Sequence, residues 1–250
     1  MARPIEQFGA NPDRPTVIEL DRCITVFQPQ FDARHELWGV EALARMQPSG
    51  DRTDQTLLRP GDFLRDITLD THAQHVIHTA LHASRVPRDI PRVSLNVPPA
   101  LLADPGFTRR LTNSFTLSDR QTAIIELLEH KELQHGEDDM DRFASGVRTL
   151  RAAGFLIAID DFPDGESSSL LLALHEAKIS PDVVKVTHNR DDDAIEELGY
   201  AISSARSIGV ECIVVEGIES QEQSVDALRA GGTVFQGFHF GRPDHISLAA

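Results

Sequence analysis

The chain has 250 residues, of which 40% are hydrophobic and 25% charged, and its formal net charge is −15. This length suits one α/β barrel with a large buried core. The negative charge argues against binding to long nucleic acids, although a small phosphate ligand can bind where clustered carboxylates hold divalent cations. No apolar run approaches the roughly 20 residues of a membrane helix, and the N-terminus lacks the apolar core of a signal peptide. We therefore expect a cytoplasmic protein with no membrane insertion.

The first 21 residues are polar and contain several prolines, and we expect residues 1–21 to form a tail that leads into one domain over residues 22–250. Cys23 and Cys212 lie inside apolar runs, and the sequence has no Cys/His spacing typical of a zinc site. Both cysteines are therefore expected to be small buried side chains.

Eight short apolar segments, rich in Val, Ile, Leu and Phe, are predicted strands, and several are separated by helical patterns. They are residues 23–31, 37–43, 92–96, 123–129, 155–161, 182–187, 211–217 and 233–238. Continuous apolar runs with helices between them indicate parallel strands that are buried on both faces. Eight of them predict a modified TIM barrel of the (β/α)₈ type. The first two are joined by too few residues for a parallel crossover, so the first strand is expected to be antiparallel.

The clearest predicted helix follows the sixth strand. Ile195, Leu198 and Ile202 recur at helical spacing, and Gly209 is expected to end this helix. The serines at 167–169 precede another apolar run and are expected to cap its helix.

Polar side chains stand at or near the ends of most of these strands, where the mouth of a barrel forms. They are Glu41, Asn96, Glu126, Asp160, Asp161, Lys185, Glu216 and Gln236. Carboxylate and carboxamide oxygens suit Mg²⁺ or Mn²⁺, and two such ions can bridge a phosphodiester and activate water. Lys185 could orient that water, help to deprotonate it, or stabilise charge on the phosphate.

Each polar residue also has a plainer interpretation, because a single one at a strand end is usually a cap or loop residue. Their succession over seven strands favours a functional site. His72, His75, His78 and His82 cluster near one face of a predicted helix. A zinc site there would need further ligands, so a helix that faces solvent or a partner is the favoured interpretation.

In this order the strand ends resemble the motifs of the EAL-domain family, the cyclic di-GMP phosphodiesterases. The tripeptide that gives the family its name stands at Glu41-Ala42-Leu43, and Asp160-Asp161-Phe162 matches the family's DDF. Weaker likenesses follow over residues 22–245, at 27–29 (FQP), 94–96 (SLN), 125–129 (IELLE), 184–186 (VKV), 216–219 (EGIE), 236–238 (QGF) and 241–243 (GRP). Each motif is weak alone, but the ordered set is specific.

The resemblance implies a role for each residue of the site. The metal ligands, for two ions of Mg²⁺ or Mn²⁺, would be Glu41, Asn96, Glu126, Asp160, Asp161 and Glu216. Lys185 would be the catalytic lysine beside the attacking water, and Gln236 would help to place that water. Gln28 would lie near a guanine, Arg45 would bind a phosphate, and Glu129 would hold the loop after Asp161. The reaction implied opens cyclic di-GMP to linear pGpG, and the resemblance also implies a homodimer.

The sequence departs from the family around the second aspartate. The family's DDFGTGYSSL reads DDFPDGESSSL here, so Pro163 replaces a glycine and one residue is added. Thr187 stands for the aspartate of the family's KID, Leu128 for a threonine and Pro98 for a serine. Altered support of this kind lowers metal affinity or rate by about 10–100-fold.

Three hypotheses follow. The complete set of ligands with Lys185 favours a metal-dependent cyclic di-GMP phosphodiesterase. The altered loop and Thr187 favour a catalytically weak or inactive EAL domain that acts as a cyclic di-GMP receptor or through a protein partner. A different Mg²⁺-dependent barrel enzyme is the third.

Overall fold

The computed structural model describes residues 20–47, 57–59, 68–128, 137–163, 165–188 and 194–246. Residues 1–19 of the predicted tail, Glu129 and the last four residues of the predicted domain lie outside this part of the chain.

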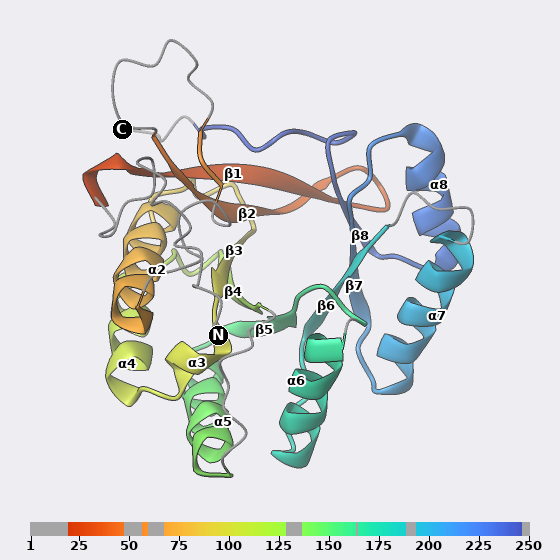
Figure 1. The fold of residues 1–250 in the computed structure, drawn as a ribbon. Helices are drawn as coiled ribbons and strands as arrows, with labels where there is room; N and C mark the ends of the chain where they lie inside the picture. The colour runs from red at the N-terminus through yellow and green to blue at the C-terminus, as the bar shows by residue number, and fades with distance from the viewer. Residues whose placement is uncertain are drawn as a thin grey trace, which may run out of the picture.

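The strands form a closed barrel in sequential order, as Figure 1 shows. They are β1 (Cys23–Asp32), β2 (Leu37–Met46), β3 (Arg92–Val97), β4 (Thr122–Leu127), β5 (Leu156–Ile159), β6 (Val183–Thr187), β7 (Cys212–Glu216) and β8 (Val234–Gln236). Each overlaps a predicted strand, so both the eight strands and the closed barrel are confirmed. The observed strands β5 and β8 are shorter than the predicted segments.

β1 runs antiparallel to both of its neighbours, which confirms the prediction for the first strand. It pairs with β2 through Gln28 opposite Glu41 and with β8 through Gln30 opposite Gln236. The remaining strand pairs are parallel. In the short connection between β1 and β2, the Asp32 carboxylate accepts hydrogen bonds from two backbone N–H groups.

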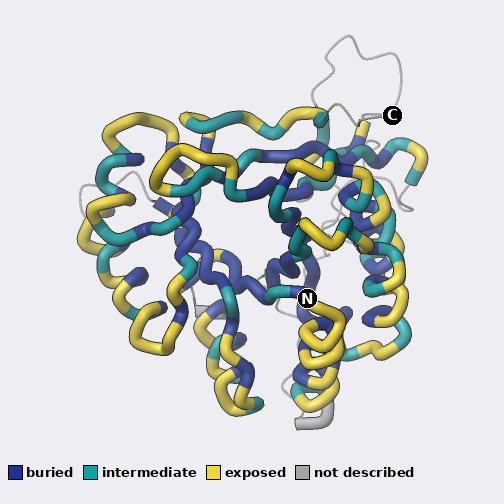
Figure 2. Tube along the Cα trace, turned by 180° about the vertical axis from the view of Figure 1, so that it is seen from behind, coloured by how far each residue is buried: buried dark blue, intermediate teal, exposed yellow. Residues whose placement is uncertain are grey.

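Helices surround the barrel. They are α2 (Leu69–Ala83), α3 (Pro99–Leu102), α4 (Pro105–Ser114), α5 (Glu137–Ala152), α6 (Gly165–Glu176), α7 (Ala194–Ser207) and α8 (Gln221–Ala230), and a 3₁₀ turn (Leu20–Arg22) precedes β1. In Figure 2 the strands are mostly buried, while the outward faces of the helices are exposed. Within the described residues, no helix combines the length and the apolar character that crossing a bilayer requires.

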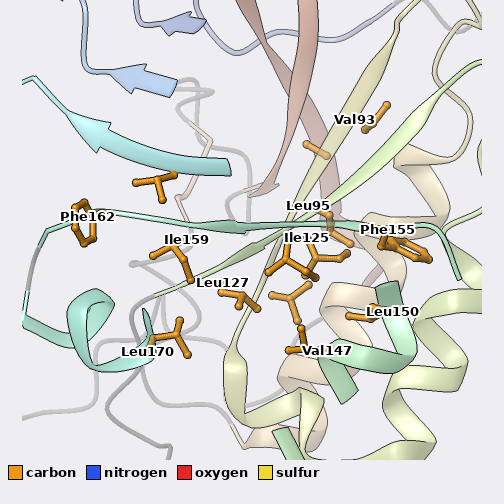
Figure 3. Packing of buried hydrophobic residues seen from close by; sticks show 14 of the residues in the cluster. Val93, Leu95, Ile125, Leu127, Val147, Leu150, Phe155, Ile159, Phe162 and Leu170 are labelled. Carbon is orange, nitrogen blue, oxygen red and sulfur yellow. The ribbon is translucent and has the colours of Figure 1, made fainter. Parts of the chain in front are cut away.

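The main core lies between the strands and the helices. Ile125 and Leu127 of β4 are fully buried and lie beside Val147 and Leu150 of α5 (Figure 3). Side chains alternate along a strand, so Glu126, which lies between Ile125 and Leu127, faces the inside of the barrel instead. This alternation places the functional side chains described below.

Two local predictions were wrong. The serines at 167–169 do not cap a helix, because α6 already begins at Gly165. The hydroxyls of Ser167 and Ser168 instead donate to the carbonyls of Asp161 and Pro163.

The helix predicted from Ile195, Leu198 and Ile202 is confirmed as α7, in which Leu198 and Ile202 are buried and Ile195 is 52% exposed. His75 is 3% exposed, so one face of the predicted histidine helix is buried in the protein rather than turned to solvent or a partner.

Candidate active site

The inside of the barrel has an apolar floor and a polar mouth, and the two are separated by a step of two residues on successive strands. The pairs are Ile124 and Glu126, Ala158 and Asp160, Val183 and Lys185, Val214 and Glu216, and Val234 and Gln236. The first member of each pair belongs to a separate buried apolar cluster. Because the second member lies on the same strand face one step nearer the carboxyl end, it reaches the mouth.

Lys185 stands at the centre of this mouth and is fully buried. Its Nζ lies 2.7 Å from Glu126 Oε2, 2.9 Å from Glu216 Oε1, 3.1 Å from Asp160 Oδ1 and 3.7 Å from Glu41 Oε2. Four carboxylates from four different strands or strand ends therefore meet at one ammonium group. The predicted convergence of these residues is observed.

Glu41 is held by carboxamides on both sides. Asn96 Nδ2 donates to Glu41 Oε1 over 2.6 Å, and Gln236 Nε2 donates to Glu41 Oε2 over 2.6 Å. Gln236 Nε2 also approaches Gln28 Oε1 at 3.2 Å, and Gln30 Nε2 donates to Gln236 Oε1 at 2.7 Å. Gln30 was missed at the level of sequence, although its position two residues after Gln28 on the same strand face was an available signal.

The electrostatics of the mouth follow from its crowding. Burial raises the pKa of Glu126 to about 8, with repulsion from Glu41 and Asp160 in the same direction and attraction to Lys185 against it. Burial likewise raises the pKa of Glu216 well above its ordinary value. Burial alone would lower the pKa of Lys185, but the surrounding carboxylates outweigh it and raise that pKa, so the lysine stays protonated.

Asp161 follows the first aspartate but does not join Lys185. The backbone of Asp161 is in the left-handed region, with φ of 48°, and this residue is exposed. The Thr187 hydroxyl donates to Asp161 Oδ1 over 3.1 Å. The threonine that replaces the family's aspartate therefore contacts the second aspartate of the DDF motif directly.

Of the predicted ligand-binding residues, the structure brings Gln28 into the site but engages Arg45 elsewhere. Arg45 Nη1 donates to the Ala44 carbonyl over 2.7 Å, and burial lowers the pKa of its guanidinium. A cavity of about 230 Å³ opens beside Glu41, Asn96 and Asp160 and is lined on another side by α2. Its helix lining includes His72, His75, Val76 and Thr79, and none of these was predicted for the site.

The donor set fits a divalent cation in its chemistry. Asn96 Oδ1 is a buried oxygen without a hydrogen-bond partner among the described residues, and four carboxyl groups face a single ammonium group there. As they stand, however, the described residues contain no group of three or more acidic, histidine or cysteine side chains arranged to hold an ion. The carboxylates are drawn onto Lys185 instead, so a cation would require them to turn away from its ammonium group.

The fold and mouth define a (β/α)₈-type barrel with one reversed strand and an acidic, lysine-centred site at the strand ends. The sequence matches the model of the EAL domain over residues 13–243. The chain therefore belongs to the EAL domain family. The match begins within the segment expected to be a tail.

Known proteins agree with this assignment. MucR of Pseudomonas aeruginosa, a bifunctional diguanylate cyclase/cyclic di-GMP phosphodiesterase, is 26% identical over 253 residues, covering 95% of this chain and 35% of MucR. A structure of the PaMucR phosphodiesterase in complex with c-di-GMP has a TM-score of 0.74 at 24% identity, over 90% of this chain and 93% of that one.

A manganese/cy-diGMP complex of Klebsiella pneumoniae BlrP1 has a TM-score of 0.69 at 24% identity, over 93% of this chain and 58% of that one. In the sequence comparison, the chain spans only about a third of the length of MucR. These solved structures confirm the fold.

Proposed function

We propose that this protein is a metal-dependent phosphodiesterase that hydrolyses cyclic di-GMP to linear pGpG. The observation that carries the proposal is the ring of Glu41, Glu126, Asp160 and Glu216 about Lys185 in the mouth of an EAL-family barrel. A cytoplasmic location and homodimerisation belong to the same proposal.

In this proposal Glu41, Asn96, Glu126, Asp160, Asp161 and Glu216 hold Mg²⁺ or Mn²⁺. The cation would stabilise charge on the phosphate and make water a stronger nucleophile at neutral pH. The involvement of a divalent metal is supported by the manganese complex of BlrP1.

The chain's own residues would position the reactants. Lys185, whose Nζ lies beside these carboxylates, would orient the attacking water, help to deprotonate it, or stabilise charge on the phosphate. Gln236 fixes one oxygen of Glu41 and would help to orient the water. Gln28, beside it, would contact the ligand's base.

The test is hydrolysis of cyclic di-GMP by purified protein with Mg²⁺ or Mn²⁺. We expect pGpG to form, to disappear with EDTA, and to fall in Glu41→Ala by more than the about 10–100-fold typical of altered supporting residues. Glu222→Ala changes an exposed glutamate on α8 and is the matched control. Turnover by Glu41→Ala equal to that of the wild type would refute the assignment of the site.

A receptor without turnover is the second candidate, and one observation favours it. Asp161 accepts a hydrogen bond from Thr187, and among the described residues the ion pairs of Lys185 are with Glu41, Glu126, Asp160 and Glu216 rather than with this second aspartate. Metal-independent binding of cyclic di-GMP with no product, measured by calorimetry beside the hydrolysis assay, would select this candidate. A protein that neither binds nor hydrolyses the dinucleotide would exclude both.

A further inference from the structure

Helix α2 carries a pair of histidines that the mouth does not use. His72 and His75 line the mouth cavity, whereas His78 and His82 do not. His78 lies about 9 Å further along the helix axis than His72, since each residue adds about 1.5 Å. His78 and His82 are four residues apart and therefore share one side of the helix. Their ring centroids are 4.4 Å apart.

Neither ring is engaged by a hydrogen bond within the described part of the chain. The Nδ1 atom of His78 is buried and has no partner there. Leaving a buried nitrogen unsatisfied is unfavourable, and such an atom in a native structure calls for an explanation such as an ion or a water.

The pair is also in the protonation state that binds metals. Burial lowers the pKa of both rings; repulsion from His82 and Arg85 acts on His78, and repulsion from Arg85 acts on His82. Both imidazoles are therefore neutral at neutral pH, with a lone pair available.

We propose that His78 and His82 together bind one late first-row transition-metal ion, such as Ni²⁺, Zn²⁺ or Cu²⁺, on the side of α2. Paired imidazoles suit these ions, whereas the oxygen ligands of the mouth suit Mg²⁺ or Mn²⁺. No third acidic, histidine or cysteine side chain among the described residues completes the site. The other coordination positions are therefore filled by water or by a group from a partner molecule.

The test measures Ni²⁺ binding to the whole chain by titration calorimetry, with excess Mg²⁺ present to compete at the oxygen ligands of the mouth. We expect His78→Ala/His82→Ala to bind one equivalent of Ni²⁺ fewer than the wild type. His82→Ala alone should show the same loss, because chelation needs both rings. His175→Ala/His245→Ala removes two exposed histidines from other parts of the fold and should bind Ni²⁺ as the wild type does.

Both histidines are only partly buried, so alanine at these helix positions should preserve the fold, and circular dichroism would verify this. Equal Ni²⁺ binding by the wild type and both His82 variants would overturn the proposal. So would an equal loss in the control pair, because the binding would then depend on scattered surface histidines.

Discussion

Replacing Glu126 with glutamine tests the electrostatic account of the mouth. The change keeps the shape of the side chain and an oxygen that can accept from Lys185, but removes the ionisable group. The pKa of Glu126 is raised in the folded protein from 4.5 to about 8, mainly by burial. Folding therefore favours the protonated form. Its stabilising effect is complete below about pH 4.5 and is lost as the pH rises to about 8.

The size of this loss follows from the pKa. Each tenfold change in proton affinity is worth about 1.4 kcal/mol, which sets an upper limit of about 5 kcal/mol for Glu126 between these two pH values. Relaxation of the buried site reduces this figure, so a difference of a few kcal/mol is expected. Glu126→Gln should lose much less stability over the same range.

The assay is urea unfolding followed by circular dichroism, in EDTA, at several pH values from about 4.5 to 8. The difference between the wild type and Glu126→Gln isolates this carboxyl group from the exposed ones. Mn²⁺ added at about pH 8 should stabilise the wild type more than the variant, because it binds the ionised ligand. Parallel pH profiles of stability for the two proteins would refute the claim that burial raises the pKa of Glu126.

Three further outcomes are expected. Gly237→Ala puts a Cβ 2.0 Å from the Ile218 carbonyl oxygen, so urea unfolding should show that the free energy of unfolding falls by about 1–3 kcal/mol. Gly199→Ala lies within α7, where an added Cβ meets open space, and the free energy of unfolding should rise by up to about 1 kcal/mol. Burial lowers the pKa of His75 to about 3, so folding favours the neutral imidazole. The stability that this preference contributes is fully present above about pH 6.5 and falls by roughly 2 kcal/mol at about pH 5. Acid unfolding of His75→Leu should lack this loss, and a pH profile equal to that of the wild type would contradict the prediction. Thr187→Asp adds a carboxylate beside the acidic side chains of the mouth and should raise Mn²⁺ affinity by about tenfold in calorimetry; an equal affinity would show that Thr187 does not limit binding.

Much of the fold was predictable because its signals are local. The apolar runs define the strands, and the short link before Leu37 requires β1 to be antiparallel. The gathering of Glu126, Asp160 and Lys185 was predictable too, since strand ends meet at one mouth of a barrel.

The details that sequence missed depend on contacts between distant segments. Nothing local shows that Lys185 meets four carboxylates, or that Gln30 supports Gln236 across the junction of β1 and β8. The hydroxyl of Ser167 donates to the Asp161 carbonyl and does not cap the helix, because α6 begins at Gly165, before its apolar residues. His75 is buried because α2 packs that side against the barrel, which helical spacing of polar residues does not reveal.

The reversal of β1 also decides where the polypeptide enters and leaves the barrel. Cys23, the first residue of β1, pairs with Met46 at the carboxyl end of β2, so the chain enters on the side of the mouth. In an all-parallel barrel the first strand would begin at the opposite end. Near the C-terminal end of the described residues, Asp244 exchanges two backbone hydrogen bonds with Phe27 of β1, at 2.8 and 3.0 Å.

Both flanks of the domain are thus fastened to one strand. That strand carries Gln28 and Gln30, which contact Gln236, and Gln236 in turn holds Glu41. A short chain of side-chain hydrogen bonds therefore ties the position of this strand to that of a carboxylate in the mouth.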